Sequence, residues 1–170
     1  LVFDESFIDF LGDAFSMRNY VKEYDNVIVV HSLTKFYAVP GLRIGGMMAN
    51  PIMINFIKSQ IPSWTVNHLA QTYSETALQD IDYIQETRSV LKREKEWLYH
   101  KLTQMESLRC IEPSVNYILC HLHEQYSLGD MIQNLYDQSI LIRDCSHYTG
   151  LGPNWFRIAV KRREQNQQLL

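Results

Sequence analysis

The sequence predicts an α/β fold, and three features carry this prediction. Residues 26–31 (Asn-Val-Ile-Val-Val-His) are apolar and β-branched on both faces, which is typical of a strand in a sheet covered by helices on both sides. Apolar residues at Ile84, Leu91, Leu98 and Met105 recur every seven positions, as on one face of a long helix. Beyond that helix, strand-like and helix-like segments alternate, which indicates a second α/β layer.

Length and composition exclude several classes of protein. A chain of 170 residues is long enough to bury about 70% of its unfolded-state surface in a core. The net charge of −3 gives no basic footprint, so we expect no nucleic-acid partner. No apolar run approaches the roughly 18 residues that a membrane span requires, so we expect a soluble protein without a membrane partner. Cys110, Cys120 and Cys145 form no C-x-x-C pair, which favours reduced thiols and a cytoplasmic location.

Three strands and two helices are expected in the first half of the chain. The run Leu1–Asp4 has the apolar pattern of a buried strand but no preceding turn or cap, so we expect the chain to be a piece of a longer protein. Residues 26–31 form the second strand. Residues 43–49 form the third, in which Gly45 and Gly46 leave room for close approach of the backbone. Helices are predicted over 51–59 and over 65–80.

The second half is expected to begin with one long amphipathic helix over residues 81–105, which joins two domains. Strands are predicted over 108–111, 117–122, 140–143 and 155–160, and helices over 127–138 and at the C-terminal end. This pattern divides the chain into domains of residues 1–80 and 81–170.

Lys35 is the sharpest chemical signal, because it lies just after the apolar strand 26–31. The carboxyl ends of strands are where open α/β sheets bind ligands. An amine that is partly buried beside other cations can lose its proton and attack an aldehyde. Ser32 and Thr34, alternating along the chain, and the cation Arg43 together suit a phosphate. A surface lysine among ordinary loop hydroxyls is the alternative interpretation.

Asp4 strengthens the chemical interpretation of Lys35. It closes the first strand, 31 positions before Lys35, so the two strand ends would place a carboxylate and an amine at one edge of a sheet. Such an acid can keep a pyridinium nitrogen protonated, which makes a pyridoxal ring an electron sink. A helix cap or a solvated strand end is the alternative role for Asp4.

Three motifs follow one another in a familiar order. They are Asp4–Phe10 (Asp-Glu-Ser-Phe-Ile-Asp-Phe), Ser32–Lys35 (Ser-Leu-Thr-Lys) with Arg43, and Phe156–Val160 (Phe-Arg-Ile-Ala-Val). In order and spacing they resemble the fold-type I pyridoxal-phosphate enzymes of the aminotransferase class I/II family. The resemblance implies that residues 1–80 are the C-terminal part of a cofactor-binding large domain with a mainly parallel sheet. Residues 81–170 would then be the small C-terminal α/β domain of a homodimeric enzyme.

The resemblance also implies a role for each candidate residue. Lys35 would bond covalently to pyridoxal 5'-phosphate, and Asp4 would pair with the nitrogen of its ring. The other candidates fall into two groups: Ser32, Thr34 and Arg43 for the cofactor phosphate, and Arg143 and Arg157 for an anionic substrate.

Within the family, three segments are similar to the threonine-phosphate decarboxylases of cobalamin biosynthesis, which are relatives of histidinol-phosphate aminotransferases. The segments are 63–70, 141–146 and 150–157. This branch implies decarboxylation of a phosphorylated amino acid, L-threonine O-3-phosphate, to aminopropanol phosphate. Transamination of the histidinol-phosphate type is the alternative. Many related aminotransferases have a tyrosine where this chain has Phe7, and its absence favours the decarboxylase.

Two further interpretations bear on the site. The segments that form the phosphate loop and the ring-stacking aromatic in this family are absent from the sequence, so the chain alone could be an inactive fragment or an interaction module. His121 and His123 would share one face of a strand, but no third ligand lies at a suitable spacing, and we expect no metal site.

Overall fold

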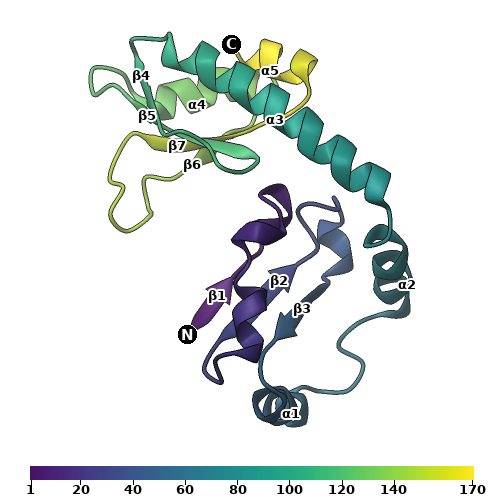
Figure 1. Ribbon diagram of the computed structural model, residues 1–170. Coiled ribbons are helices and arrows are strands. Elements are labelled where there is room, and N and C mark those ends of the chain that lie inside the picture. The colour runs from purple at the N-terminus through teal and green to yellow at the C-terminus, as the bar shows by residue number, and fades with distance from the viewer. The chain divides into compact units, whose positions relative to one another are not determined.

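The computed structural model describes residues 1–170, which divide into two compact units, Leu1–Asp82 and Tyr83–Leu170. Each unit contains one sheet with its own helices (Figure 1). The α/β fold class is confirmed. The assignment of residues 1–80 to a large cofactor-binding domain and of residues 81–170 to a small domain stays a prediction.

The sheet of the first unit has the strand order β1-β2-β3, with β1 over Val2–Asp4, β2 over Ile28–Ser32 and β3 over Gly45–Met48. Strand β1 runs parallel to β2, and their pairing continues one residue beyond β1, where Glu5 N donates to Val30 O at 2.8 Å. Strand β3 runs antiparallel to β2. The apolar pattern of residues 26–31 therefore marks a strand that is central in this sheet and has one parallel and one antiparallel neighbour.

Capping residues determine where the helices of the first unit begin. Helix α1 (Pro51–Gln60) starts after Asn50, whose side chain accepts a hydrogen bond from Met53 N at 2.8 Å. Helix α2 (His68–Ala77) starts after Asn67, which caps Ala70 N at 2.9 Å. The prediction for 51–59 is confirmed, whereas the helix predicted over 65–80 is shorter because Asn67 caps it. Three 3-10 helices, over Ile8–Phe10, Asp13–Phe15 and Met17–Lys22, connect β1 to β2.

The second unit contains the elements that the sequence predicts, in the predicted order. They are α3 (Ile81–Thr103), β4 (Leu108–Cys110), β5 (Tyr117–Leu122), α4 (Leu128–Asp137), β6 (Arg143–Asp144), β7 (Trp155–Ala159) and α5 (Arg163–Leu169). The strand predicted over 140–143 begins only at Arg143. Ile140 N instead donates to Leu135 O at 2.8 Å and so belongs to the turn that ends α4.

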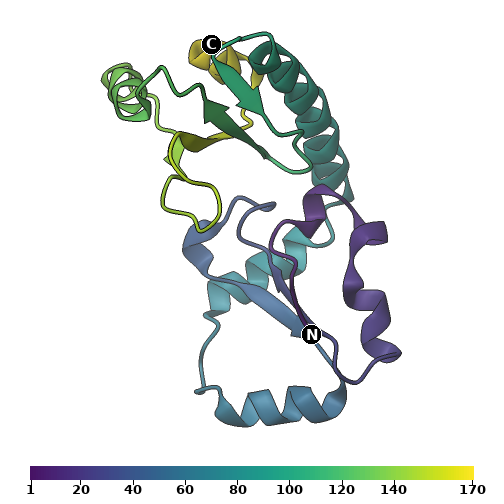
Figure 2. The same ribbon diagram turned by 90° about the vertical axis from the view of Figure 1, so that its left-hand side faces the viewer.

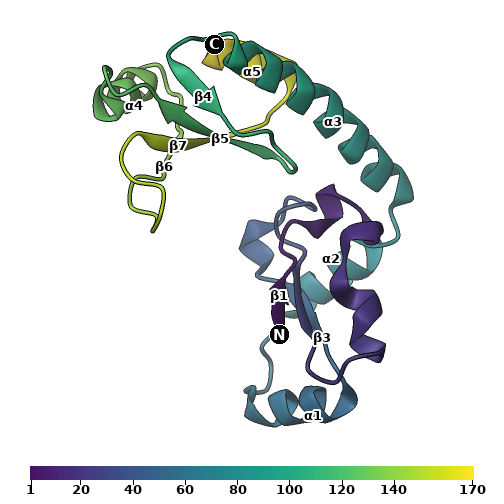
Figure 3. The same cartoon turned by 60° about the vertical axis from the view of Figure 1, so that its left-hand side comes forward.

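The side chains of strand β5 alternate between the two faces of the second sheet. Its residues Ile118, Cys120 and Leu122 are buried and pack with Leu98 and Leu102 of α3. Leu128 of α4 and Leu169 of α5 join the same cluster, so the helices cover one face, and α5 lies alongside α3 (Figures 2 and 3). The alternate residues of β5 are only partly buried and form the other face of this unit's sheet.

Cys110 and Cys120 lie directly opposite each other on β4 and β5, with 3.1 Å between their Sγ atoms. Both thiols are free, as is that of Cys145. Their spacing of ten residues along the chain gives no sign of this contact, which the strand register creates. None of the helices combines the length and the apolar composition needed to cross a membrane.

A buried carboxylate ties α5 to α3. Glu94 is 3% exposed and accepts bonds from Arg163 Nε at 2.8 Å and from Arg93 Nε at 3.2 Å. The Arg163 guanidinium also lies 4.2 Å from the ring centroid of Trp97. The bond from Arg163, with a smaller effect of Arg93, holds the pKa of Glu94 below its usual range despite burial.

We expect Glu94→Gln to lower the free energy of unfolding by about 2 kcal/mol at neutral pH, because two charged hydrogen bonds are weakened in a buried place. A lowered folded-state pKa gives stability that is present above the unfolded pKa and is lost as the pH falls through the folded one. The difference between the two proteins should therefore vanish in acid. Urea unfolding at neutral and acidic pH measures it, with the exposed Glu96→Gln as control. Equal stabilities at neutral pH would contradict the role assigned to Glu94.

Candidate functional site at the carboxyl ends of β1 and β2

The parallel pairing of β1 and β2 brings Asp4 and Lys35 to one edge of the sheet. Asp4 is the last residue of β1 and lies opposite Val30, and Lys35 follows three residues after the end of β2. The Asp4 carboxylate accepts bonds from the Ser6 hydroxyl and from Ser6 N, the latter at 2.9 Å. These two bonds, and to a smaller extent the positive charge of Lys35, hold the pKa of Asp4 below its usual range. The site therefore contains an ionised acid within the electrostatic reach of an amine.

Phe7 provides a surface for the amine. Lys35 Nζ lies 5.2 Å from the centroid of the Phe7 ring, which is a cation–π distance. The Lys35 side chain is otherwise exposed. Phe7 has no hydroxyl with which to donate a hydrogen bond, so its contribution at this position is contact with the ammonium group.

The hydroxyl groups of Ser32 and Thr34 meet, with 2.8 Å between Ser32 Oγ and Thr34 Oγ1. Thr34 is buried, and its N–H faces Ser32 Oγ at 3.4 Å. Ser32 pairs with Gly45 of β3, where an added Cβ would lie 2.5 Å from His31 O. The predicted need for a glycine is confirmed at Gly45. It is wrong at Gly46, where a Cβ would meet nothing within 4 Å.

The backbone at Arg43 runs back alongside Thr34. Leu33 N donates to Ile44 O at 3.2 Å, so the residues on either side of this bond, Thr34 and Arg43, run alongside each other. Arg43 has a left-handed backbone with φ of 51° and donates to Pro40 O at 2.9 Å, and its side chain is exposed. A non-glycine residue seldom adopts this conformation, which turns the chain sharply into β3. The structure thus places the hydroxyl pair and this cation on neighbouring segments.

Arg143 and Arg157 belong to the second unit, where they are direct partners across β6 and β7. Side chains of directly opposed residues lie on the same face of a sheet, so the two guanidinium groups share one face. The Arg157 guanidinium lies 4.7 Å from the ring centroid of Tyr117, which also belongs to the face away from the helices. Arg143 is exposed. Two forked donors on one face are suited to an anion with several oxygens.

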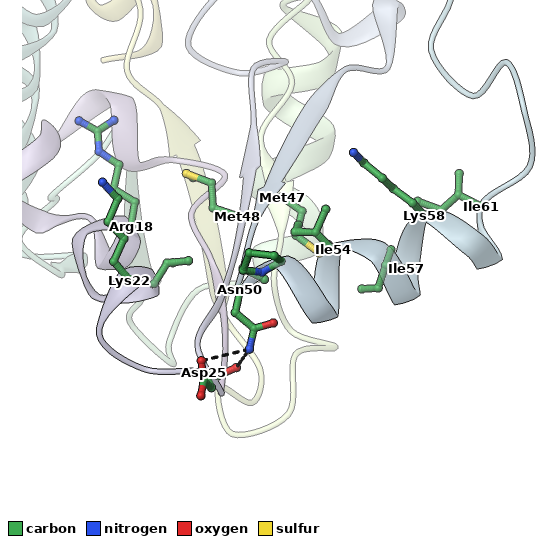
Figure 4. Close-up of a pocket in the computed structure, with 13 residues that line it drawn as sticks. Arg18, Lys22, Asp25, Met47, Met48, Asn50, Ile54, Ile57, Lys58 and Ile61 are labelled. Carbon is green, nitrogen blue, oxygen red and sulfur yellow. Dashed lines mark hydrogen bonds between the residues drawn. The ribbon is translucent and has the colours of Figure 1, made fainter.

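A groove in the first unit is a different feature. This groove of about 910 Å³ lies between β3 and α1, and Met47, Met48, Ile54 and Ile57 form its apolar wall (Figure 4). Figure 4 also shows Asn50, beside this groove, bonded to Asp25. Met48 pairs with Val29, so the groove is at the end of β2 opposite to Ser32. It therefore contains neither Asp4 nor Lys35.

His121 and His123 each have a contact within the second unit, and that of His123 is a hydrogen bond from Gln125 N to its Nδ1 at 3.3 Å. The ring of His121 packs on Trp155, with 5.0 Å between centroids. No group of three or more His, Cys, Asp or Glu side chains in the structure is arranged to hold a metal ion.

The sequence analysis did not identify the contacts of the other two acids in the segment Asp4–Phe10. Glu5 is 7% exposed and accepts bonds from Ser16 Oγ and Met17 N, both at 2.6 Å. Asp9 Oδ2 lies 2.7 Å from His31 Nε2. The available signal was the presence of three acids within six residues.

We expect Ser6→Ala to raise the pKa of Asp4 toward its usual value, because the variant loses the hydroxyl bond that contributes most to the depression. Carboxyl chemical shifts in an NMR titration measure this change. Ser146→Ala is a matched control, since the backbone N–H of Ser146 and also its hydroxyl bond to a carboxylate, that of Asp144 in the second unit, and lower its pKa. It should move the pKa of Asp144 and leave Asp4 unchanged. An Asp4 pKa in Ser6→Ala that is as low as in the unaltered protein would refute this account.

Known proteins are similar to this chain in sequence. The threonine-phosphate decarboxylase of Salmonella typhimurium is 36% identical over 172 residues, which cover 100% of this chain and 46% of that protein. A histidinol-phosphate aminotransferase from Methanocaldococcus jannaschii is 25% identical over 170 residues, which cover 100% of this chain and 45% of that protein.

Solved structures show the same fold. The histidinol-phosphate aminotransferase from Clostridium acetobutylicum matches 98% of this chain with a TM-score of 0.93 and 30% identity, over 51% of that structure. The L-threonine-O-3-phosphate decarboxylase from Porphyromonas gingivalis matches 98% of this chain with a TM-score of 0.86 and 25% identity, again over 51% of that structure. The chain spans about half the length of these relatives.

The family described as aminotransferase class I and II matches residues 1–170, and its enzymes depend on pyridoxal phosphate. The chain therefore belongs to the aminotransferase class I and II family.

Proposed function

We propose that this chain is the C-terminal half of a pyridoxal-phosphate enzyme whose cofactor is held at the carboxyl ends of β1 and β2. The observation that carries the proposal is the meeting of an ionised Asp4 with the Lys35 amine at one sheet edge. An acid and an amine in this arrangement can hold opposite ends of one aromatic ring. The hydroxyl pair of Ser32 and Thr34, with the exposed Arg43 beside it, supplies donors for a phosphate.

Lys35 and Asp4 have different proposed roles in this site. Pyridoxal phosphate, when bound, draws electrons from the Cα bond of an amino acid that stands perpendicular to its ring. Lys35 would supply the amine that condenses with the cofactor aldehyde, with the carbonyl oxygen leaving as water. Both bonds from Ser6 end on Asp4 Oδ1, which leaves Oδ2 to accept a hydrogen bond from a protonated ring nitrogen. Because the pKa of Asp4 is low, the carboxylate stays charged and keeps that proton on the nitrogen.

Arg143 and Arg157 are proposed to decide the reaction by the way they hold the substrate. If Arg157 held the substrate carboxylate in the plane of the ring, the Cα–H bond would stand upright and transamination would follow. If both arginines bind a substrate phosphate instead, the bond from Cα to the carboxylate can be perpendicular to the ring, and the carboxylate can leave as carbon dioxide. Their shared face and opposed positions support joint binding of one multi-oxygen anion.

We propose decarboxylation of L-threonine O-3-phosphate, which gives aminopropanol phosphate for cobalamin synthesis. The support is the 36% identity to the decarboxylase from Salmonella typhimurium, against 25% to the aminotransferase from Methanocaldococcus jannaschii. Phe7, which lacks a hydroxyl for the cofactor, points the same way. A histidinol-phosphate-type aminotransferase is the second candidate, because the structure from Clostridium acetobutylicum gives a TM-score of 0.93.

We further propose that the enzyme is a cytoplasmic homodimer. Large apolar side chains of α1 and the segment after it are exposed: Ile52 at 81%, Phe56 at 62% and Trp64 at 97%. Exposed apolar side chains of this size support an interface with another protein surface. The chain alone, without the other half of the site, is expected to be inactive.

We expect Lys35→Ala to abolish the visible absorption that pyridoxal phosphate acquires on bonding to a protein lysine. The measurement uses the full-length protein, in which this chain is joined to the half that its relatives also contain. Lys58→Ala is the matched control, since Lys58 lies on α1 beside the groove and away from the strand ends. A band that persists in Lys35→Ala would remove Lys35 from its role. The 170-residue chain alone should show no such band at stoichiometric cofactor.

We expect the full-length protein with pyridoxal phosphate to release carbon dioxide from L-threonine O-3-phosphate. Isotope-labelled carboxyl carbon trapped as carbonate measures decarboxylation, and a keto-acid assay with an amino acceptor measures transamination. Arg143→Ala and Arg157→Ala should each reduce the rate at low substrate by about 100-fold, because a charged, forked contact is lost. Keto acid without carbon dioxide would favour the aminotransferase.

A further inference from the structure

The contact between Asp9 and His31 joins the two segments that carry the proposed cofactor residues Asp4 and Lys35. His31 is the residue of β2 before Ser32, and Asp9 is the middle residue of the 3-10 helix Ile8–Phe10. Their Oδ2 and Nε2 atoms are 2.7 Å apart, and the two side chains are only 15% and 19% exposed. This ion pair thus connects the segment after β1 to the strand that leads to Lys35.

Two aromatic contacts connect the same segments on either side of Asp9. Phe7 lies under the Lys35 ammonium, and Phe10 packs edge-on against Phe36 with 5.0 Å between centroids. A 3-10 helix of one turn has little stability of its own and depends on such contacts for its position. The Asp9–His31 pair adds to them a directional bond, which fixes where the helix lies along β2.

The charges around His31 favour its protonated form. The bond to Asp9 has the largest effect and raises the pKa of His31 above its usual value, while burial opposes it. The Asp9 and Glu5 charges raise this pKa further, and Arg18 lowers it slightly. The carboxylate of Glu5 is itself held by Ser16 and Met17, so its charge stays near His31. His31 is therefore charged at neutral pH to a greater extent than a free histidine.

We propose that Asp9 and His31 are a positioning pair, which in its charged form holds the segment Asp4–Phe10 on β2 at the spacing that lets Asp4 and Lys35 bind one cofactor ring. This inference rests on the proposed function of Lys35. His31 and Asp9 do not touch the cofactor in this scheme, and they act through Asp4, Phe7 and Lys35.

Protonation gives the pair a definite direction of pH dependence. The charged pair exists below the raised pKa of His31 and becomes a weaker neutral hydrogen bond as the pH rises through it. The affinity for pyridoxal phosphate should therefore fall as the pH rises through the pKa of His31. A permanently charged side chain at position 31 would remove that contribution.

The first measurement needs no cofactor. NMR titration of the His31 ring in the full-length protein should give a pKa above 6.5, and Asp9→Asn should lower it. A pKa of 6.5 or less in the unaltered protein, or no change in Asp9→Asn, would overturn the pair. Neither result depends on whether Lys35 binds a cofactor.

The second measurement compares cofactor affinity across pH in the unaltered protein, His31→Gln and His31→Arg. Between neutral and alkaline pH, the affinity of the unaltered protein for the cofactor should fall by about five-fold more than that of His31→Arg, whose side chain keeps its charge. His31→Gln should bind weakly at all pH values, and recovery in His31→Arg shows that the charge matters. If His31→Gln binds as tightly as the unaltered protein at every pH, the pair has no positioning role. Loss of binding in Lys35→Ala, measured alongside, separates this outcome from failure of the proposed function.

Discussion

The parallel pairing of β1 with β2 is the constraint on which the candidate site depends. Parallel neighbours end at the same edge of a sheet, so Asp4 and the residues after Ser32 meet although about thirty positions separate them in sequence. If the pairing shifted by one residue, Asp4 would point to the other face. The bond from Glu5 N to Val30 O extends the ladder to the last position before the chain turns, which holds this edge in register.

Opposite charges collect on the two segments that leave this edge. Asp4 ends β1, and Glu5 and Asp9 lie on the segment after it; each of these carboxylates has hydrogen-bonding partners in the structure. The segment after β2 carries the cations Lys35 and Arg43 on exposed side chains. The acids thus bond to groups within the fold and the cations are left accessible, which suits the proposed site for an anionic cofactor.

In the second unit, the alternation of side chains along β5 separates the core from a polar face of the sheet. Strand β5 directs Ile118, Cys120 and Leu122 into the helix-covered core, so its neighbours can place polar groups on the opposite face without disturbing that core. Arg157 lies on that polar face, where its guanidinium contacts the ring of Tyr117. Position 157 lies between buried Phe156 and Ile158, which makes its orientation a consequence of packing.

Local patterns were enough to identify most elements and the candidate residues, because caps such as Asn50, periodic apolar faces and apolar strands act over a few residues. Lys35 and Asp4 could be selected from their places after such strands. The antiparallel direction of β3, the start of β6 only at Arg143, the Cys110–Cys120 contact and the Asp9–His31 pair could not. Each of these depends on which segments become neighbours in space, and long-range pairing leaves no periodic trace along the chain.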